Sequence, residues 1–125
     1  MTSPSVVSTL SGSQLRAMFA AATNWLERHV EAINAINVFP VPDGDTGTNM
    51  YLTMRSTLEE AYRADANSVG AVLRAMSKGA LMGARGNSGV ILSQIIRGLA
   101  CAAEEREHLD ARGLAAGLVE AAATA

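Results

Sequence analysis

Apolar residues recur at steps of three and four along most of the chain, and this spacing constrains the fold more than any other feature of the sequence. About half of the residues are apolar (49%), but only 4% are aromatic, and alanine supplies much of the apolar content. Alanine is the best helix former and a poor strand former, so an all-α fold is expected. The clearest helical face consists of Leu15, Met18, Phe19, Ala22, Trp25, Leu26, Val30, Ile33 and Ile36.

Capping residues and turn formers divide the chain into five expected helices. Ser11 and Gln14 have the spacing of a capping box, which predicts that the first helix begins near Ser11. That helix should end before Pro40, because the residue ahead of a proline avoids helical geometry. No strand is expected, and residues 1–10 form a predicted tail ahead of one helical domain over residues 11–125. The other helices are expected to begin at Thr46 or Thr48 (ending near Ala64), after a cap at Asn67 or Ser68, at about Ser88, and after a cap at Asp110.

Charge and cysteine content exclude several classes of protein. The net charge is −2, so nothing favours nucleic acid as a partner. Cys101 is the only cysteine, which excludes an internal disulfide and a multi-cysteine zinc site, and its helical surroundings predict a buried thiol. The chain shows no secretory signal and no apolar run long enough to span a bilayer. We therefore expect a soluble cytoplasmic protein.

The segment from Asn37 to Gly47 is the densest in turn formers, and it contains two aspartates separated by one glycine. Asp43 and Asp45 repel each other at this spacing, and a hard divalent cation would relieve the repulsion. The following helix offers free N–H groups and a partial positive charge at its start. The pattern therefore predicts a metal ion on the aspartates and a phosphate beside it.

The aspartate-containing segment has two alternative explanations, an EF-hand and a helix N-cap. An EF-hand requires glycine at the sixth position and glutamate at the twelfth, where this chain has Thr48 and Met54, so that class is excluded. Either aspartate alone is also explained as the N-cap of the next helix. The whole stretch, with its prolines, glycines and Asn49, favours the metal site.

A second glycine-rich segment, Gly83 to Gly89, precedes an apolar helix. Glycine allows close backbone approach, so such a segment at a helix start can bind an anion. It is neither a P-loop nor a dinucleotide-binding fingerprint, because the required lysine and glycine spacings are absent. Taken alone, it is equally well explained as a helix–helix turn with a serine cap.

The two segments together resemble the signatures of a known family. Asn37–Met50 looks like the first signature of the nucleotide-binding domain of bacterial fatty acid kinase, and Leu81–Gln94 is similar to its second. Both belong to the wider group of dihydroxyacetone kinase L-type domains. The resemblance implies an antiparallel helical barrel with ATP and Mg²⁺ bound by loops at one end. The family domain has about eight helices, so the five expected here would form an incomplete barrel.

The resemblance also implies which residues form the site. Asp43 and Asp45 correspond to metal-ligating aspartates with a catalytic role, and Asn37 stands about where the wider group has a further aspartate ligand. The positions that correspond to nucleotide contacts are Thr46, Thr48, Asn49, Gly86, Asn87 and Ser88.

The expected function is therefore an ATP- and Mg²⁺-dependent phosphotransferase domain. The resemblance implies a fatty acyl acceptor presented by a separate fatty-acid-binding protein. The alternatives are a kinase domain for dihydroxyacetone or another small polyol, and a truncated, non-catalytic interaction module. Because five helices would leave apolar faces uncovered, a homo-oligomer is also expected, with exchange of elements between copies as one route.

Overall fold

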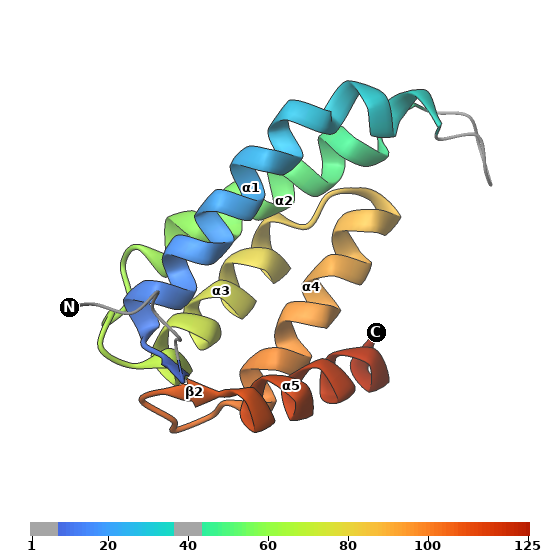
Figure 1. The fold of residues 1–125 in the computed structure, drawn as a ribbon. Helices are drawn as coiled ribbons and strands as arrows, with labels where there is room; N and C mark the ends of the chain where they lie inside the picture. The colour runs from blue at the N-terminus through green and yellow to red at the C-terminus, as the bar shows by residue number, and fades with distance from the viewer. Residues whose placement is uncertain (1–7, 37–43) are drawn as a thin grey trace.

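A computed structural model of the protein describes residues 8–36 and 44–125. Successive helices lie side by side and run in alternating directions, and the last one crosses α4 (Figure 1). The expectation of an all-α fold with five helices is confirmed. The helices are α1 (Gly12–Ala35), α2 (Thr46–Ala61), α3 (Val69–Gly83), α4 (Gly86–Ala102) and α5 (Ala111–Thr124).

Local capping fixes the start of three helices as the sequence predicts. Ser11 and Gln14 form both hydrogen bonds of the capping box at α1. Ser68 accepts a hydrogen bond from the Ala71 N–H at α3, and Asp110 accepts one from the Gly113 N–H at α5. The ends of the helices differ more, since α2 stops three residues before the expected end and α4 begins two residues before Ser88.

The expectation of no strand is wrong for four residues. Thr9–Leu10 (β1) pairs antiparallel with Leu109–Asp110 (β2), directly before α1 and α5 respectively. The connection from α4 to β2 also binds the start of α3, because the N–H groups of Val69 and Gly70 donate to the carbonyls of Glu107 and Arg106. Neither the helical periodicity nor the capping residues of the sequence indicate these long-range backbone contacts, because both are local patterns.

The core is built from all five helices, with Leu109 of β2 and Ala121 of α5 buried in the same cluster as residues of α1 to α4. On α1, Leu15 is buried and Phe19 and Leu26 pack against the core, but Met18, Trp25 and Ile36 do not join it. The expected apolar face of α1 is therefore wider than the face that the core covers. The largest fully buried apolar side chains are Val69, Val72, Leu73, Met76 and Ile96.

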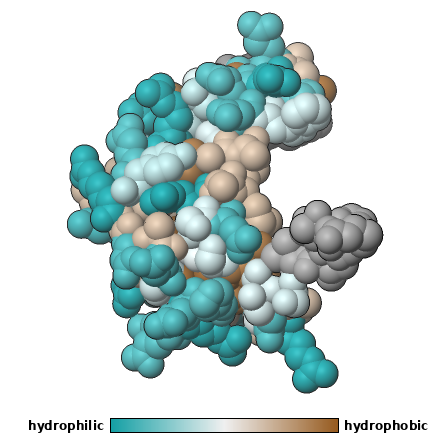
Figure 2. All heavy atoms as spheres, turned by 60° about the vertical axis from the view of Figure 1, so that its left-hand side comes forward, coloured by the Kyte–Doolittle hydropathy of each residue, from teal (hydrophilic) through white to brown (hydrophobic). Residues whose placement is uncertain are grey.

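Several large apolar side chains remain at the surface. Trp25 is 64% exposed, and Ile91 of α4 and Leu118 of α5 are also exposed. Figure 2 shows hydrophobic atoms gathered in a band along a hollowed side of the molecule, bordered by hydrophilic atoms. None of the helices within residues 8–36 and 44–125 combines the length and the apolar character that a membrane span requires.

Glycine allows a close backbone approach where α5 crosses α4. A Cβ atom at Gly98 would fall on the backbone of Ala121, well inside van der Waals contact. A Cβ atom at Gly117, on the same interface, would meet the Leu99 side chain at 3.0 Å instead. Backbone cannot move aside as readily as a leucine side chain, so these two glycines differ in their tolerance of substitution.

Gly98→Ala is expected to lower the free energy of unfolding by about 1–3 kcal/mol, because the new methyl group forces α5 away from α4. Urea titration followed by circular dichroism measures this change. Gly117→Ala is the matched control and should have a smaller effect. Equal stability of Gly98→Ala and the wild type would contradict the close contact.

Candidate functional site

The first turns of α2 and α4 lie at the same end of the molecule, beside the C-terminal end of α1 (Figure 1). They touch directly, since the Ser88 hydroxyl donates to the Thr46 carbonyl at 3.5 Å. The turn of α2 follows the two aspartates, and the turn of α4 lies within the glycine-rich segment, about forty residues further along the chain. The fold therefore joins the two segments that the sequence singled out.

The start of α2 is capped from another helix. The Asn34 side-chain oxygen, near the end of α1, accepts hydrogen bonds from the N–H groups of Gly47 (2.8 Å) and Thr48 (3.2 Å). The Asn34 amide nitrogen donates to the Thr48 hydroxyl at 3.0 Å. One side chain thus satisfies two of the N–H groups that a helix start leaves unpaired, and it fixes Thr48. Sequence reasoning did not single out Asn34, because local capping patterns look only within a few residues.

Asp45 occupies the N-cap position of α2, but its side chain makes no capping hydrogen bond. The simpler explanation is therefore confirmed for the position of Asp45 as the N-cap residue, but its side chain does not supply the capping hydrogen bond. Asp43 and Asn37, the other two predicted metal ligands, lie outside the described residues. Within the described part of the chain, no three His, Cys, Asp or Glu side chains gather as a metal site would require.

The start of α4 differs from the other helix starts. Gly86 has a φ of +65°, in the left-handed region that favours glycine. Arg85, at the N-cap position, provides no side-chain cap, and the helical hydrogen bonds begin with the Gly89 N–H donating to the Arg85 carbonyl. The N–H groups of Gly86, Asn87 and Ser88 therefore precede the first helical bond. Such a helix start can bind an anion.

The glycine-rich segment packs directly on α2. A Cβ atom at Gly86 would lie 2.5 Å from the Asn49 amide nitrogen, and one at Gly89 would lie 2.5 Å from the Thr53 hydroxyl oxygen. The same hydroxyl accepts a hydrogen bond from the Arg85 N–H at 3.2 Å. Glycine at both positions permits an approach that any side chain would prevent. Among the predicted nucleotide contacts, Asn49 and Gly86 are thus neighbours, and Asn87 is exposed beside them.

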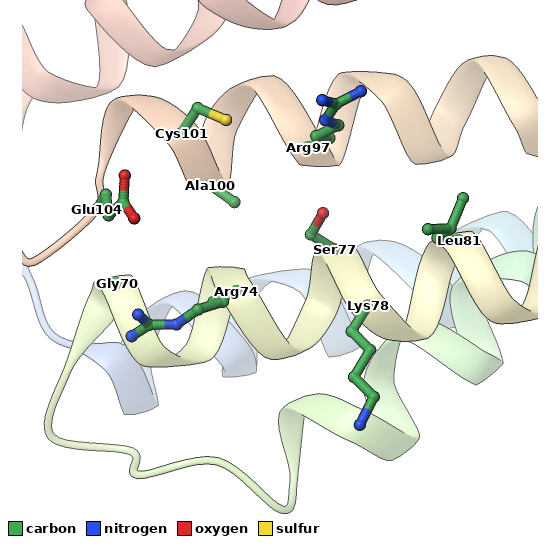
Figure 3. Close-up of a pocket in the computed structure, with 9 residues that line it drawn as sticks. All are labelled: Gly70, Arg74, Ser77, Lys78, Leu81, Arg97, Ala100, Cys101 and Glu104. Carbon is green, nitrogen blue, oxygen red and sulfur yellow. The ribbon is translucent and has the colours of Figure 1, made fainter.

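A separate groove of about 360 Å³ lies between α3 and α4 and contains none of the predicted site residues. Figure 3 shows its lining, with Lys78 pointing away from α4 and Cys101 on α4 near Arg97. Cys101 is exposed, so the expectation of a buried thiol is wrong. Its helix is apolar overall, but its own position faces outward from the core. The groove is therefore not part of the candidate site.

Comparison with known proteins gives a consistent result. Residues 40–125 match the DAK2 domain. The chain is 48% identical over 112 residues to Protein YloV of Bacillus subtilis, which covers 90% of this chain and 20% of that protein. Uncharacterised proteins of Staphylococcus saprophyticus and Staphylococcus haemolyticus are 44% and 43% identical over 110 residues, with 88% of this chain covered in each case. The chain spans about 20% of the length of these curated relatives.

Asn34→Ala is expected to lower the free energy of unfolding by about 1–2 kcal/mol, because the N–H groups of Gly47 and Thr48 lose their acceptor. Thermal unfolding followed by circular dichroism checks this change. Asn24→Ala is the matched control, since Asn24 is an exposed asparagine on the same helix. If both variants unfold alike, Asn34 does not cap α2 in solution.

Proposed function

The chain belongs to the DAK2 domain family, the ATP-binding domain of dihydroxyacetone kinases, and from this premise we propose that it binds Mg²⁺-ATP for phosphoryl transfer. The proposal depends chiefly on the contact between the first turns of α2 and α4. One turn follows the acidic segment and the other contains the glycine-rich segment. A metal ion held near the first turn and a phosphate held at the second would be close enough to neutralise each other.

Asp45, together with Asp43, is the proposed holder of the metal ion, and Asn37 is a further candidate. Carboxylate oxygens are the ligands that Mg²⁺ prefers. Asp45 stands at the N-cap of α2, beside the start of the helix that Asn34 caps, so its carboxylate lies next to the proposed phosphate site. When bound, Mg²⁺ would neutralise phosphate charge during transfer.

The start of α4 is the proposed phosphate-binding element. The N–H groups of Gly86, Asn87 and Ser88 precede the helical hydrogen bonds and can donate to phosphate oxygens. Thr46, Thr48 and Asn49, in the first turn of α2, are the further proposed nucleotide contacts. Catalysis would then consist of positioning the phosphates and neutralising their charge, with no covalent step on the protein.

The proposed phosphoryl acceptor is a fatty acyl group delivered by a fatty-acid-binding partner protein, as the two signature segments imply. Dihydroxyacetone or another small polyol is the alternative acceptor. A further alternative is a non-catalytic module that binds nucleotide weakly or not at all. An assay of phosphoryl transfer to each acceptor, with the partner protein added, separates the two kinase functions.

Titration calorimetry tests nucleotide binding directly. The wild type is expected to bind ATP in the presence of Mg²⁺ and to bind it at least about tenfold more weakly without the metal. The double variant Asp43→Ala/Asp45→Ala should lose the metal-dependent part, because the carboxylates that hold the ion are removed.

Glu59→Ala removes an exposed carboxylate elsewhere on α2 and serves as the control. It should bind Mg²⁺-ATP as the wild type does. Absence of binding in the wild type would instead favour the non-catalytic module, and metal-dependent binding that survives in the double variant would refute the metal site.

We also propose that the chain self-associates through its exposed apolar surface. Trp25 and Met18 of α1 are 64% and 50% exposed, and Leu118 and Val119 of α5 are exposed as well. A large contiguous apolar patch at a protein surface is typical of contact surfaces. The proposed assembly is a dimer or a larger homo-oligomer.

Light scattering is expected to give a mass above that of the 13.0 kDa chain. Trp25→Lys should reduce this mass, since it places a charge in the apolar contact. The neighbouring Asn24→Lys adds the same charge at an already polar position and should not. A stable monomer of the wild type at all concentrations would contradict self-association.

A further inference from the structure

Thr53 is a buried polar residue that connects the two halves of the candidate site. It lies on α2, one turn after Asn49, and its side chain is fully buried. Its hydroxyl donates to the Asn49 carbonyl at 2.7 Å and accepts from the Arg85 N–H at 3.2 Å. A hydroxyl group can donate once and accept as well, so both kinds of bond are in use.

The bond to Arg85 joins α2 to the residue that begins the phosphate-binding turn. Arg85 is the N-cap of α4, and its backbone sets the direction in which the next three N–H groups point. Gly89, one turn later, rests against the same hydroxyl. The Thr53 side chain therefore contacts the turn at its first residue and again at Gly89.

We propose that Thr53 is a positioning residue for nucleotide binding, which holds the first turn of α4 at a fixed distance from the first turn of α2. This role rests on the nucleotide site proposed above. The first turn of α2 and the first turn of α4 must both contact the same Mg²⁺-ATP molecule. A small shift of one turn relative to the other would therefore weaken all the contacts that the shifted turn makes with the ligand.

Thr57 provides a comparison within the same helix. It is also a fully buried threonine, and its hydroxyl donates to the carbonyl one turn earlier, that of Thr53, at 2.8 Å. No hydrogen bond joins its side chain to α4 among the described residues. The two threonines thus share burial, helix and local bonding, and they differ in the contact with Arg85.

The test compares Thr53→Val, Thr57→Val and Thr53→Ser by calorimetry with Mg²⁺-ATP, alongside thermal unfolding of each variant. Valine keeps the shape of threonine but removes the hydroxyl, whereas serine keeps the hydroxyl. Thr53→Val is expected to weaken binding roughly tenfold. Thr57→Val and Thr53→Ser should stay within about twofold of the wild type. Equal weakening by both valine variants, or unchanged binding by folded Thr53→Val, would overturn the proposal.

Amide hydrogen exchange at Arg85, measured by NMR without nucleotide, gives a second readout. The Arg85 amide should exchange faster in Thr53→Val than in Thr57→Val or Thr53→Ser, because only the first variant removes its acceptor. This result does not require ATP binding. If the wild type fails to bind Mg²⁺-ATP, the proposed function fails, and the exchange rates still decide whether Thr53 holds the turn. Unchanged exchange at Arg85 in Thr53→Val would refute the positioning role.

Discussion

The close approach of the glycine-rich turn to α2 is the contact on which the arrangement of the site depends. Gly86 and Gly89 meet Asn49 and Thr53, which lie one turn apart on α2. A side chain at either glycine would push α4 away and separate the two helix starts. The lack of a side chain at Gly86 and Gly89 is therefore as important for the spacing of the two helix starts as the polar groups around them.

Helix starts in this protein are satisfied in two different ways. In α1, α3 and α5, a backbone N–H group of the first turn donates to the side-chain oxygen of the helix's own N-cap residue. In α2, the N–H groups donate to the side-chain oxygen of Asn34 on the preceding helix. Within the described residues, the start of α4 has neither kind of side-chain cap. Since unpaired N–H groups are costly unless solvated or bound, the start of α4 is the natural place for an anionic ligand.

The sequence predicts the parts of this structure that depend on local rules. Helical periodicity indicates five helices, and Ser11, Ser68 and Asp110 act as the expected caps. Contacts between distant segments were harder to predict. The cap from Asn34 bridges thirteen residues to Gly47, and the Arg85–Thr53 bond bridges 32, so no short-range pattern indicates either one. The exposure of Trp25 could not be predicted for a similar reason. Periodicity identifies the apolar face of a helix but does not show how much of that face the neighbouring helices cover.

The exposed position of Trp25 has a practical consequence. It is the only tryptophan in the sequence, and its ring lies beside that of His29 in a tilted arrangement with centroids 4.7 Å apart. Indole fluorescence shifts to shorter wavelength when water is excluded from the ring. The intrinsic emission of this protein therefore comes from one place on α1. The wavelength of the tryptophan emission reports whether that surface is exposed to water or covered.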